Sequence, residues 1–144
     1  MIKEINSSEI KKYLEENTNA EILDVRTPGE WKTTGRPDGK KIGTKTHFVT
    51  IVRDAGGKVD LSFIDKVKEK IDVKKKLLVI CRSGSRSALA SHLLSKENYE
   101  CINIIDGYEG NGVSPGWINE NLPYYFDNEE WKKFLLFTDI ITKN

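Results

Sequence analysis

The chain has 144 residues, of which 38% are hydrophobic and 31% are charged, and its formal net charge is +1. This length suits one ordinary domain with its own apolar core. A net charge so close to zero excludes a broad electrostatic attraction to nucleic acid or to a membrane surface, so any charged ligand must be recognised by local groups.

The sequence contains two cysteines, Cys81 and Cys101, which could form at most one disulfide bridge. A secreted domain of this size that depends on disulfides would carry more, so a reducing compartment is expected. The N-terminal residues lack the basic start and the apolar run of a signal peptide, and the longest apolar run, residues 77–81, is far too short to span a bilayer. We therefore expect a cytoplasmic protein, or a periplasmic one if a signal peptide has been removed from the sequence.

The first half of the chain alternates apolar runs with polar turns. Its predicted elements are, in order, a helix over 7–17, a strand over 21–26, a helical turn over 30–32, a strand over 48–52 and a turn over 54–57. Ser7 and Ser8 are candidate N-caps of the first helix. The first strand carries Asp24 and Arg26 at its carboxyl end, immediately before the turn sequence Thr-Pro-Gly.

The second half continues this alternation. Its predicted elements are, in order, a helix over 60–71, a strand over 76–80, a helix over 85–98 and a strand over 101–105. In the predicted helix over 85–98, Ala88, Leu89, His92 and Leu93 recur at helical spacing, which indicates one face of the helix, and His92 is expected either to pack or to meet solvent. Strands that alternate with helices at such intervals predict one α/β domain with a mainly parallel sheet.

The C-terminal stretch is less regular than the rest. Its predicted segments are a loop over 111–116, irregular chain over 117–125 and an amphipathic helix over 128–137, with Trp131, Phe134, Leu135 and Phe137 as the apolar residues of that helix. We divide the chain into a catalytic domain over 1–126 and a C-terminal extension over 127–144. The helix of the extension is expected to dock on the domain.

One loop concentrates the chemistry of the sequence, Cys81-Arg82-Ser83-Gly84-Ser85-Arg86. The buried strand before it would deliver Cys81 to the carboxyl end of the sheet, where open α/β sheets bind their ligands. A tight loop that contains a glycine would turn several N–H groups inward, and the next helix would add its positive N-terminus. The amides and the two arginines would favour a thiolate, so Cys81 is a candidate nucleophile at neutral pH.

Four stretches of the sequence are, in order, EILDVRTPGEW, LLVICRSGSRSALASHLL, YECINIIDGYEG and GWINENLPYY. They resemble the first strand, the active-site strand, loop and helix, the final strand and the closing segment of the rhodanese family of sulfurtransferases, over about residues 4–126. The resemblance implies a rhodanese-like five-stranded parallel sheet flanked by helices on both faces. It also implies transfer of a sulfane sulfur from thiosulfate or a persulfide donor to a thiol or cyanide acceptor through a cysteine persulfide.

The resemblance also assigns roles to the residues of the loop. Cys81 is expected to be the nucleophile that carries the persulfide. The residues expected to bind substrate are Arg82, Ser83, Gly84, Ser85 and Arg86. The two arginines would bind an anionic donor and stabilise the departing sulfite, and the three residues between them would hold the outer sulfur with their N–H groups.

Supporting roles are expected for residues beside the loop. Asp24 and Arg26 would buttress the site from the neighbouring strand, and Arg26 could also pair with Glu30 at helical spacing. Ser87 could contribute its hydroxyl to the site or cap the helix that follows. Tyr108 and the two residues after it follow the last strand, so they are expected at the rim of the pocket.

Two other functions are compatible with a reactive cysteine. Phosphatases on the same fold place five residues between the cysteine and the essential arginine, whereas four separate Cys81 from Arg86, and Ile80 stands where phosphatases commonly have histidine. The smaller ring fits a terminal sulfur better than a phosphoryl group. The second alternative is a sulfur carrier or redox-responsive module whose acceptor is a partner protein.

No metal or organic cofactor is expected. His47 and His92 have no metal-ligand spacing to each other or to the cysteines. Cys101 starts a strand, away from the carboxyl ends, so a packed structural thiol is favoured over a resolving cysteine. The expected partners are a small anionic sulfur donor and a thiol or cyanide acceptor, with a protein acceptor as the alternative and with neither nucleic acid nor membrane.

Overall fold

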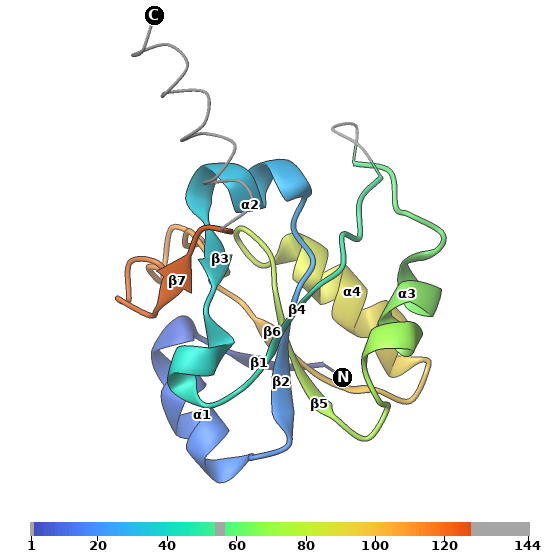
Figure 1. The fold of residues 1–144 in the computed structure, drawn as a ribbon, viewed down its shortest axis with the longest axis horizontal. Coiled ribbons are helices and arrows are strands. Elements are labelled where there is room, and N and C mark those ends of the chain that lie inside the picture. Colours follow the sequence, from blue (N-terminus) through green and yellow to red (C-terminus); the bar gives the residue numbers. More distant parts are fainter. Residues whose placement is uncertain (1, 54–56, 128–144) are drawn as a thin grey trace, which may run out of the picture.

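The computed structural model describes residues 2–53 and 57–127. Its centre is a sheet of five parallel strands in the order β1–β6–β5–β2–β4 (Figure 1). These strands are β1 (Lys3–Ile5), β2 (Ala20–Asp24), β4 (Thr46–Phe48), β5 (Lys76–Ile80) and β6 (Glu100–Ile104). The predicted α/β class and its five-stranded parallel sheet are confirmed.

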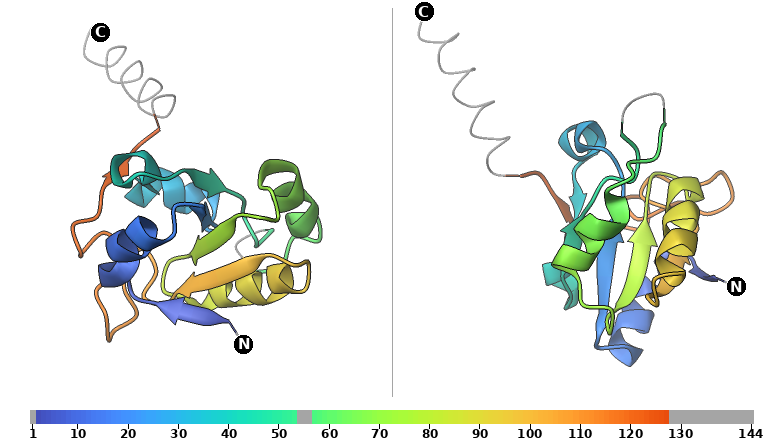
Figure 2. Two further views of the ribbon diagram at one scale, coloured as in Figure 1. Left: turned by 90° about the horizontal axis from the view of Figure 1, so that it is seen from below. Right: turned by 90° about the vertical axis from the view of Figure 1, so that its right-hand side faces the viewer.

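Helices cover both faces of this sheet. They are the short 3-10 helices η1 (Ser7–Glu9) and η2 (Gly39–Ile42) and the α-helices α1 (Ile10–Glu16), α2 (Pro28–Thr34), α3 (Phe63–Lys70) and α4 (Ser85–Ser95). Figures 1 and 2 show α1 on one face of the sheet and α3 with α4 on the other, while α2 lies beyond the carboxyl ends of the strands. A small second sheet pairs β3 (Arg36–Pro37) with β7 (Tyr124–Tyr125).

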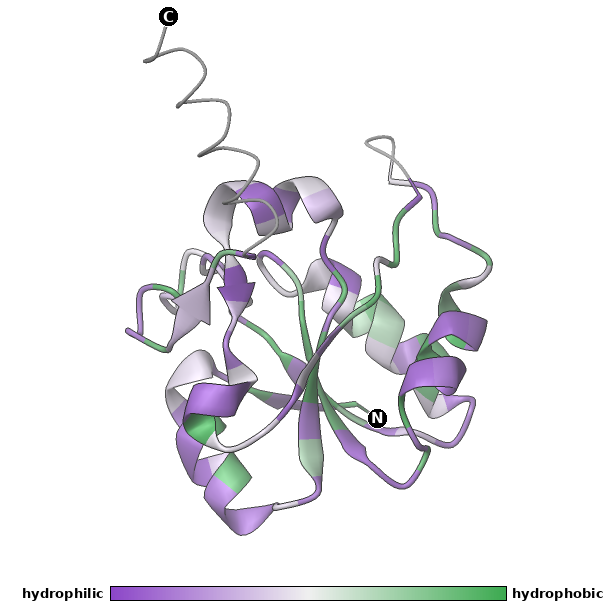
Figure 3. Cartoon of the chain, in the orientation of Figure 1, coloured by the Kyte–Doolittle hydropathy of each residue, from purple (hydrophilic) through white to green (hydrophobic). Residues whose placement is uncertain are grey.

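Two apolar cores lie on the two faces of the central sheet, because successive residues of a strand point in opposite directions. In β5, Leu77 and Val79 pack with α3 and α4, whereas Leu78 and Ile80 pack with α1. All four side chains are fully buried. A strand that serves both cores must be apolar at nearly every position, and Figure 3 shows hydrophobic residues concentrated in the central strands.

The buried face of α4 differs from the predicted one. Its buried residues are Ser87, Ala90, Ser91 and Leu94, whereas Ala88, Leu89 and His92 are exposed and Leu93 is half-buried. The helix begins directly after the loop at the end of β5, and this connection sets its rotation about its axis. Small side chains on the inner face let α4 approach the sheet closely, which apolar spacing alone could not indicate.

Several boundaries also differ from the prediction. The first helix opens with η1, and Ser7 does not cap it, because its hydroxyl donates to the Asp106 carboxylate at 3.0 Å. Strand β4 lies earlier than the predicted 48–52, because Thr46 to Phe48 pair with Ile22 to Asp24 of β2. The edge strand β1 was missed because its sequence Lys-Glu-Ile is short and polar.

Asp106, which follows β6 in the chain, links three segments that are distant in the sequence. Its buried carboxylate accepts hydrogen bonds from the N–H and the hydroxyl of Ser7 and from the N–H of Gly116. Its carbonyl accepts from the N–H of Gly110 at 2.9 Å. The loop between Gly110 and Gly116 is therefore closed at its base, while its tip at Val113 is 93% exposed.

The described residues contain no helix that is long and apolar enough to cross a membrane, and no group of His, Cys, Asp and Glu side chains that could hold a metal ion. The predicted turn over 54–57 lies mostly outside the described residues. The predicted C-terminal helix over 128–137 lies entirely outside them, so its docking on the domain stays a prediction.

Candidate active site

Cys81 lies directly after β5, at the carboxyl end of the sheet, and only 1% of its surface is exposed. The N–H of Gly84 donates a hydrogen bond to its Sγ at 3.1 Å. The hydroxyl Oγ of Ser87 lies 3.2 Å from the same sulfur. The loop thus curls around the thiol, and one N–H group, at the start of α4, is aimed at the atom that would carry a negative charge.

Ser87 and Asn103 form a buried network behind the sulfur. The Ser87 hydroxyl lies 2.6 Å from Asn103 Oδ1 and 3.1 Å from the carbonyl oxygen of Gly84. Asn103 Nδ2 in turn donates to the Gly84 carbonyl at 3.2 Å. The hydroxyl can donate its single proton to Asn103 while it accepts from a Cys81 thiol, or donate it to a Cys81 thiolate. The network therefore serves both protonation states of the sulfur.

Asn103 was missed in the sequence analysis. It is a nearly buried amide in β6, whose other inward residues are apolar. A polar residue inside an otherwise apolar strand needs hydrogen-bond partners, and that requirement was the signal that could have drawn attention to it.

The loop is held by close contact with the chain that follows β6. Gly84 has φ +107°, and a Cβ there would lie 2.2 Å from the carbonyl oxygen of Ile105. Gly107 has φ +61°, and a Cβ there would lie 2.4 Å from the carbonyl oxygen of Arg82. The N–H of Tyr108 also donates to the Cys81 carbonyl at 2.8 Å. Both glycines are required by this approach of one backbone to another.

Arg86 forms a two-pronged ion pair with Glu30 of α2. Its Nη1 and Nη2 atoms lie 2.7 and 2.9 Å from Glu30 Oε1 and Oε2. Glu30 Oε1 also accepts from the N–H and the hydroxyl of Thr27, which closes a capping box at the start of α2. Burial raises the pKa of Glu30, but the hydrogen bonds from Arg86 and Thr27 outweigh burial and lower it to about 2. The pair is therefore fully charged at neutral pH.

Arg82 makes the second ion pair of the loop. Its Nε lies 3.0 Å from Glu109 Oε2, and its side chain is 64% exposed. Arg82, Arg86, Glu30 and Glu109 all line one cavity of about 560 Å³, whereas Cys81 is not among its lining residues. Its other lining residues are Thr27, Thr33, Thr34, Val52 and Gly57. Each arginine predicted to bind an anionic donor thus already faces a carboxylate.

Asp24, Arg26 and Tyr108 form a fully buried unit beside the loop. Arg26 donates to both carboxylate oxygens of Asp24, at 2.8 to 3.1 Å, and its guanidinium lies 4.0 Å from the centre of the Tyr108 ring. The expected pair between Arg26 and Glu30 does not form, because each has a different partner. The Arg26 guanidinium and the Tyr108 hydroxyl both bond to Thr34 at the end of α2.

This placement corrects the expectation for Tyr108. Its side chain is fully buried rather than at the rim of the pocket, while the next residue, Glu109, does line the cavity. Burial raises the pKa of the Tyr108 hydroxyl, which keeps it protonated as a donor to the Thr34 carbonyl. The unit of Asp24, Arg26 and Tyr108 fixes α2, and α2 carries Glu30 to the mouth of the site.

The other predicted residues of the loop differ in exposure. Ser83 and Ser85 are exposed, whereas Gly84 is buried. The structure thus brings Gly84 and Ser87 to the Cys81 sulfur, whereas Arg82 and Arg86 line the cavity beside the loop. Roles in catalysis and substrate binding for these residues stay predictions.

Residues for which a packing role was favoured lie elsewhere. Cys101 is 5% exposed, and burial raises its pKa to about 12. It pairs in register with Leu77, four residues before Cys81 on the neighbouring strand, which places the two sulfurs about 13 Å apart along the sheet. A disulfide needs Cα atoms within about 7 Å. His47 is buried and lies 2.9 Å from Glu21 Oε1, while His92 is exposed on α4.

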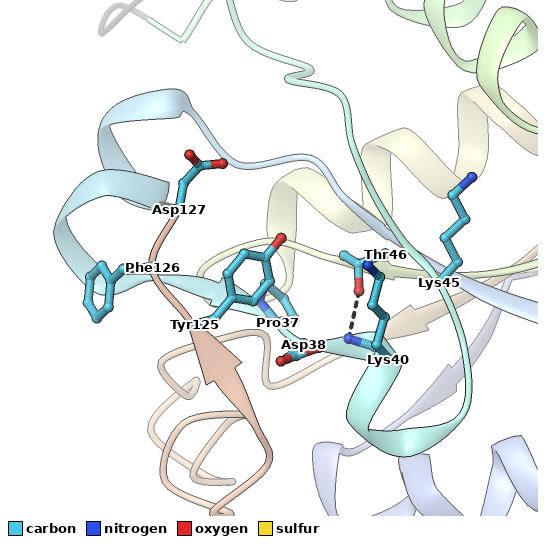
Figure 4. Close-up of a pocket in the computed structure, with 9 residues that line it drawn as sticks. Pro37, Asp38, Lys40, Lys45, Thr46, Tyr125, Phe126 and Asp127 are labelled. Carbon is cyan, nitrogen blue, oxygen red and sulfur yellow. Dashed lines mark hydrogen bonds between the residues drawn. The ribbon is translucent and has the colours of Figure 1, made fainter. Parts of the chain in front are cut away.

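Figure 4 shows the residues that line a second cavity, of about 520 Å³. This cavity shares no lining residue with the first. Its lining residues are Pro37, Asp38, Gly39, Lys40, Lys45, Thr46, Tyr125, Phe126 and Asp127. The hydroxyl of Thr46 accepts a hydrogen bond from the N–H of Gly39 at 3.0 Å. The first cavity is lined by Arg82 and Arg86 of the reactive loop, whereas no residue of that loop lines the second.

The family described as the STR4 middle domain matches residues 4–131. The chain belongs to this family. An uncharacterized protein of Rickettsia prowazekii is 34% identical to this chain over 127 residues, which cover 88% of the chain and 99% of the relative. One from Rickettsia conorii is 32% identical over 126 residues, covering 87% and 98% of the two proteins.

Several solved structures share the fold of this chain. The protein Rv0390 from M. tuberculosis has a TM-score of 0.74 at 25% identity, covering 86% of this chain and 97% of the other. A rhodanese-like domain protein from Staphylococcus aureus has a TM-score of 0.60 at 18% identity, covering 88% and 100%. The polysulfide-sulfur transferase homodimer from Wolinella succinogenes has a TM-score of 0.60 at 22% identity, covering 88% and 80%. The fold is rhodanese-like, as predicted.

Proposed function

We propose that the protein is a sulfurtransferase that carries a sulfane sulfur as a persulfide on Cys81. The observation that carries this proposal is the arrangement around the sulfur, where the Gly84 N–H and the Ser87 hydroxyl both lie within hydrogen-bond distance of Sγ. Groups of this kind stabilise a thiolate, which is the nucleophilic form of cysteine. The rhodanese-like fold and its occurrence in a polysulfide-sulfur transferase give further support.

The reaction takes place in two steps. In the first, the Cys81 thiolate attacks the outer sulfur of the donor, the bond between that sulfur and the rest of the donor breaks, and the donor remnant leaves with the electron pair. With thiosulfate, the products are the Cys81 persulfide and sulfite. In the second, an acceptor such as cyanide attacks the outer sulfur, thiocyanate leaves and the Cys81 thiolate is regenerated. Neither step requires a metal or an organic cofactor.

The chain's own residues prepare both steps. The Gly84 N–H and the Ser87 hydroxyl hold Sγ in place, and the Asn103 side chain holds the Ser87 hydroxyl. The negative charge that passes between Sγ and the outer sulfur stays near the start of α4, where the positive end of a helix favours it. We place the reaction in the cytoplasm, with a small thiol, cyanide or a partner protein as the acceptor.

The test is the mass of the protein after incubation with thiosulfate or a persulfide donor. We expect the mass of one sulfur atom to be added and then removed by cyanide. Cys81→Ser should prevent the adduct, with Cys101→Ser as the matched control that retains it. An unchanged mass with every donor would refute the proposal. Hydrolysis of a phosphate ester that is lost in Cys81→Ser would instead favour the phosphatase alternative.

A further inference from the structure

The charged side chains that line the cavity sum to a net charge of zero. Among the described residues that line the cavity beside the loop, the two cations are Arg82 and Arg86 and the two anions are Glu30 and Glu109. Each cation lies against one of the anions, at 3.0 Å for Arg82 and at 2.7 and 2.9 Å for Arg86. The mouth therefore lacks the surplus of positive charge that would attract a dianion such as thiosulfate.

The pair of Arg86 and Glu30 is also held in place. Glu30 uses both oxygens on the two terminal nitrogens of Arg86, and one of these oxygens also accepts two hydrogen bonds from Thr27. A dianion that approached Arg86 would have to share the guanidinium with this fixed carboxylate and would lie beside a like charge. Because the pKa of Glu30 is about 2, the carboxylate does not become neutral at physiological pH.

The cavity has room for a donor larger than thiosulfate. Its volume is about 560 Å³, within the range of roughly 300–1,000 Å³ that is usual for small-molecule sites. Its uncharged lining includes Val52, Thr33 and Thr34. Cys81 is 1% exposed and is not among the lining residues, so a donor held in the cavity would have to extend its terminal sulfur past the loop to reach Sγ.

We propose, building on the sulfurtransferase function above, that the donor is an organic persulfide rather than thiosulfate and that Glu30 sets this preference. In the reaction, the Cys81 thiolate attacks the outer sulfur of R–S–SH and a new S–S bond forms. The bond between the two donor sulfurs breaks, R–S⁻ leaves with the electron pair, and the outer sulfur keeps its proton as Cys81–S–SH. The leaving group R–S⁻ carries one negative charge. Thiosulfate would bring two negative charges and would release sulfite as a dianion.

The experiment compares how fast two donors load sulfur onto Cys81 of the full chain, with thiosulfate as one donor and the persulfide of 2-mercaptoethanol, whose organic part is uncharged, as the other. The rate constant of adduct formation is followed by intact mass. The two donors differ in intrinsic reactivity, so the decisive quantity is how their ratio changes between variants. Glu30→Gln should shift the ratio toward thiosulfate by about tenfold or more, because Gln keeps the capping box but removes the competing charge.

Two further variants sharpen the comparison. Glu109→Gln should shift the ratio in the same direction by only about two- to threefold, because the Arg82 pair is exposed to solvent and screened by it. Glu97→Gln is the matched control, since it removes the same charge from the surface pair with Lys68 beyond the far end of α4, and should leave the ratio unchanged.

The outcomes separate the two proposals. If neither donor adds sulfur to Cys81, the sulfurtransferase function itself is wrong. A second outcome is that both donors add sulfur, but Glu30→Gln and Glu109→Gln leave the ratio of the two loading rates unchanged or slow both donors equally. In that case the carboxylates only support the arginines, and the proposed preference is wrong. A wild-type protein that thiosulfate loads faster than the persulfide would overturn it as well.

Discussion

The two cysteines of this chain lie in the same apolar core and are almost equally buried, yet their surroundings are opposite. Cys81 follows β5 at the carboxyl end of the sheet, where the N–H of Gly84 points at its sulfur. Cys101 lies near the start of β6, at the opposite end of the sheet. There burial is the main influence on the thiol and raises its pKa to about 12. Burial alone therefore does not make a cysteine inert or reactive, and the groups aimed at its sulfur decide.

The largest expected effect comes from replacing each of the two cysteines in turn by serine. Cys81→Ser should abolish sulfur loading and turnover, because the other thiol, Cys101, lies about 13 Å away along the sheet. Cys101→Ser should leave both within about twofold of wild type, since it removes only a packed side chain. The measurement is thiocyanate formation from each donor with cyanide as acceptor. Turnover that depends on Cys101 would break the comparison.

A nearly equal effect is expected from Gly84→Ala. The Cβ would lie 2.2 Å from the Ile105 carbonyl oxygen at a φ of +107°, so the loop must move and its N–H would leave the sulfur. We expect the free energy of unfolding to fall by about 2–4 kcal/mol and sulfur loading to fall by about 100-fold. Urea unfolding and intact mass measure the two effects. Gly43→Ala is the control, because Gly43 also has positive φ but has no atom close to a Cβ.

Ser87→Ala should have a moderate effect. It removes the hydroxyl that lies 3.2 Å from Cys81 Sγ and 2.6 Å from Asn103 Oδ1. A hydrogen bond to a charged group contributes about 1.5–3 kcal/mol, so sulfur loading should slow by about tenfold or more. Ser91→Ala is the matched control, since Ser91 is buried one turn later on the same face of α4. Equal rates for Ser87→Ala and wild type would show that the hydroxyl only caps the helix.

The smallest effect concerns the reactivity of Cys101 toward an alkylating reagent. A raised pKa means that the folded protein keeps this thiol protonated until the pH approaches about 12. Between pH 7 and 9, iodoacetamide should therefore add one group per folded chain, on Cys81, and a second group only after denaturation. In Cys81→Ser the native protein should add none. Peptide mapping identifies the labelled cysteine. Rapid labelling of Cys101 in the native protein would contradict the expected difference in reactivity between the two thiols.

The sequence was a good guide wherever a property depends on neighbouring residues. The strand over 76–80 was predicted to the residue, because a run that serves two cores is apolar throughout. The position of Cys81 at the end of that strand followed directly. The inner face of α4 was predicted wrongly, because Ser87 and Ser91 are buried by the connection to β5 and not by hydrophobicity.

The charge balance of the site could not be predicted, because it depends on contacts between distant residues. Arg86 and Glu30 are 56 residues apart, and only the packing of α2 over the end of the sheet brings them together. From the sequence, Glu30 could instead pair with Arg26, four residues away. Burial of Arg26 against Asp24 and Tyr108 prevents that pair and leaves Glu30 to face the loop.

The clamp formed by Asp106 has a consequence for engineering the protein. The chain enters and leaves the loop over 111–115 at Gly110 and Gly116, and both N–H groups are bonded to Asp106. Extra residues inserted after Val113, which is 93% exposed, would extend into solvent without moving the residues that hold Cys81. A fluorescent reporter or an affinity peptide placed there would extend from the domain as an independent attachment.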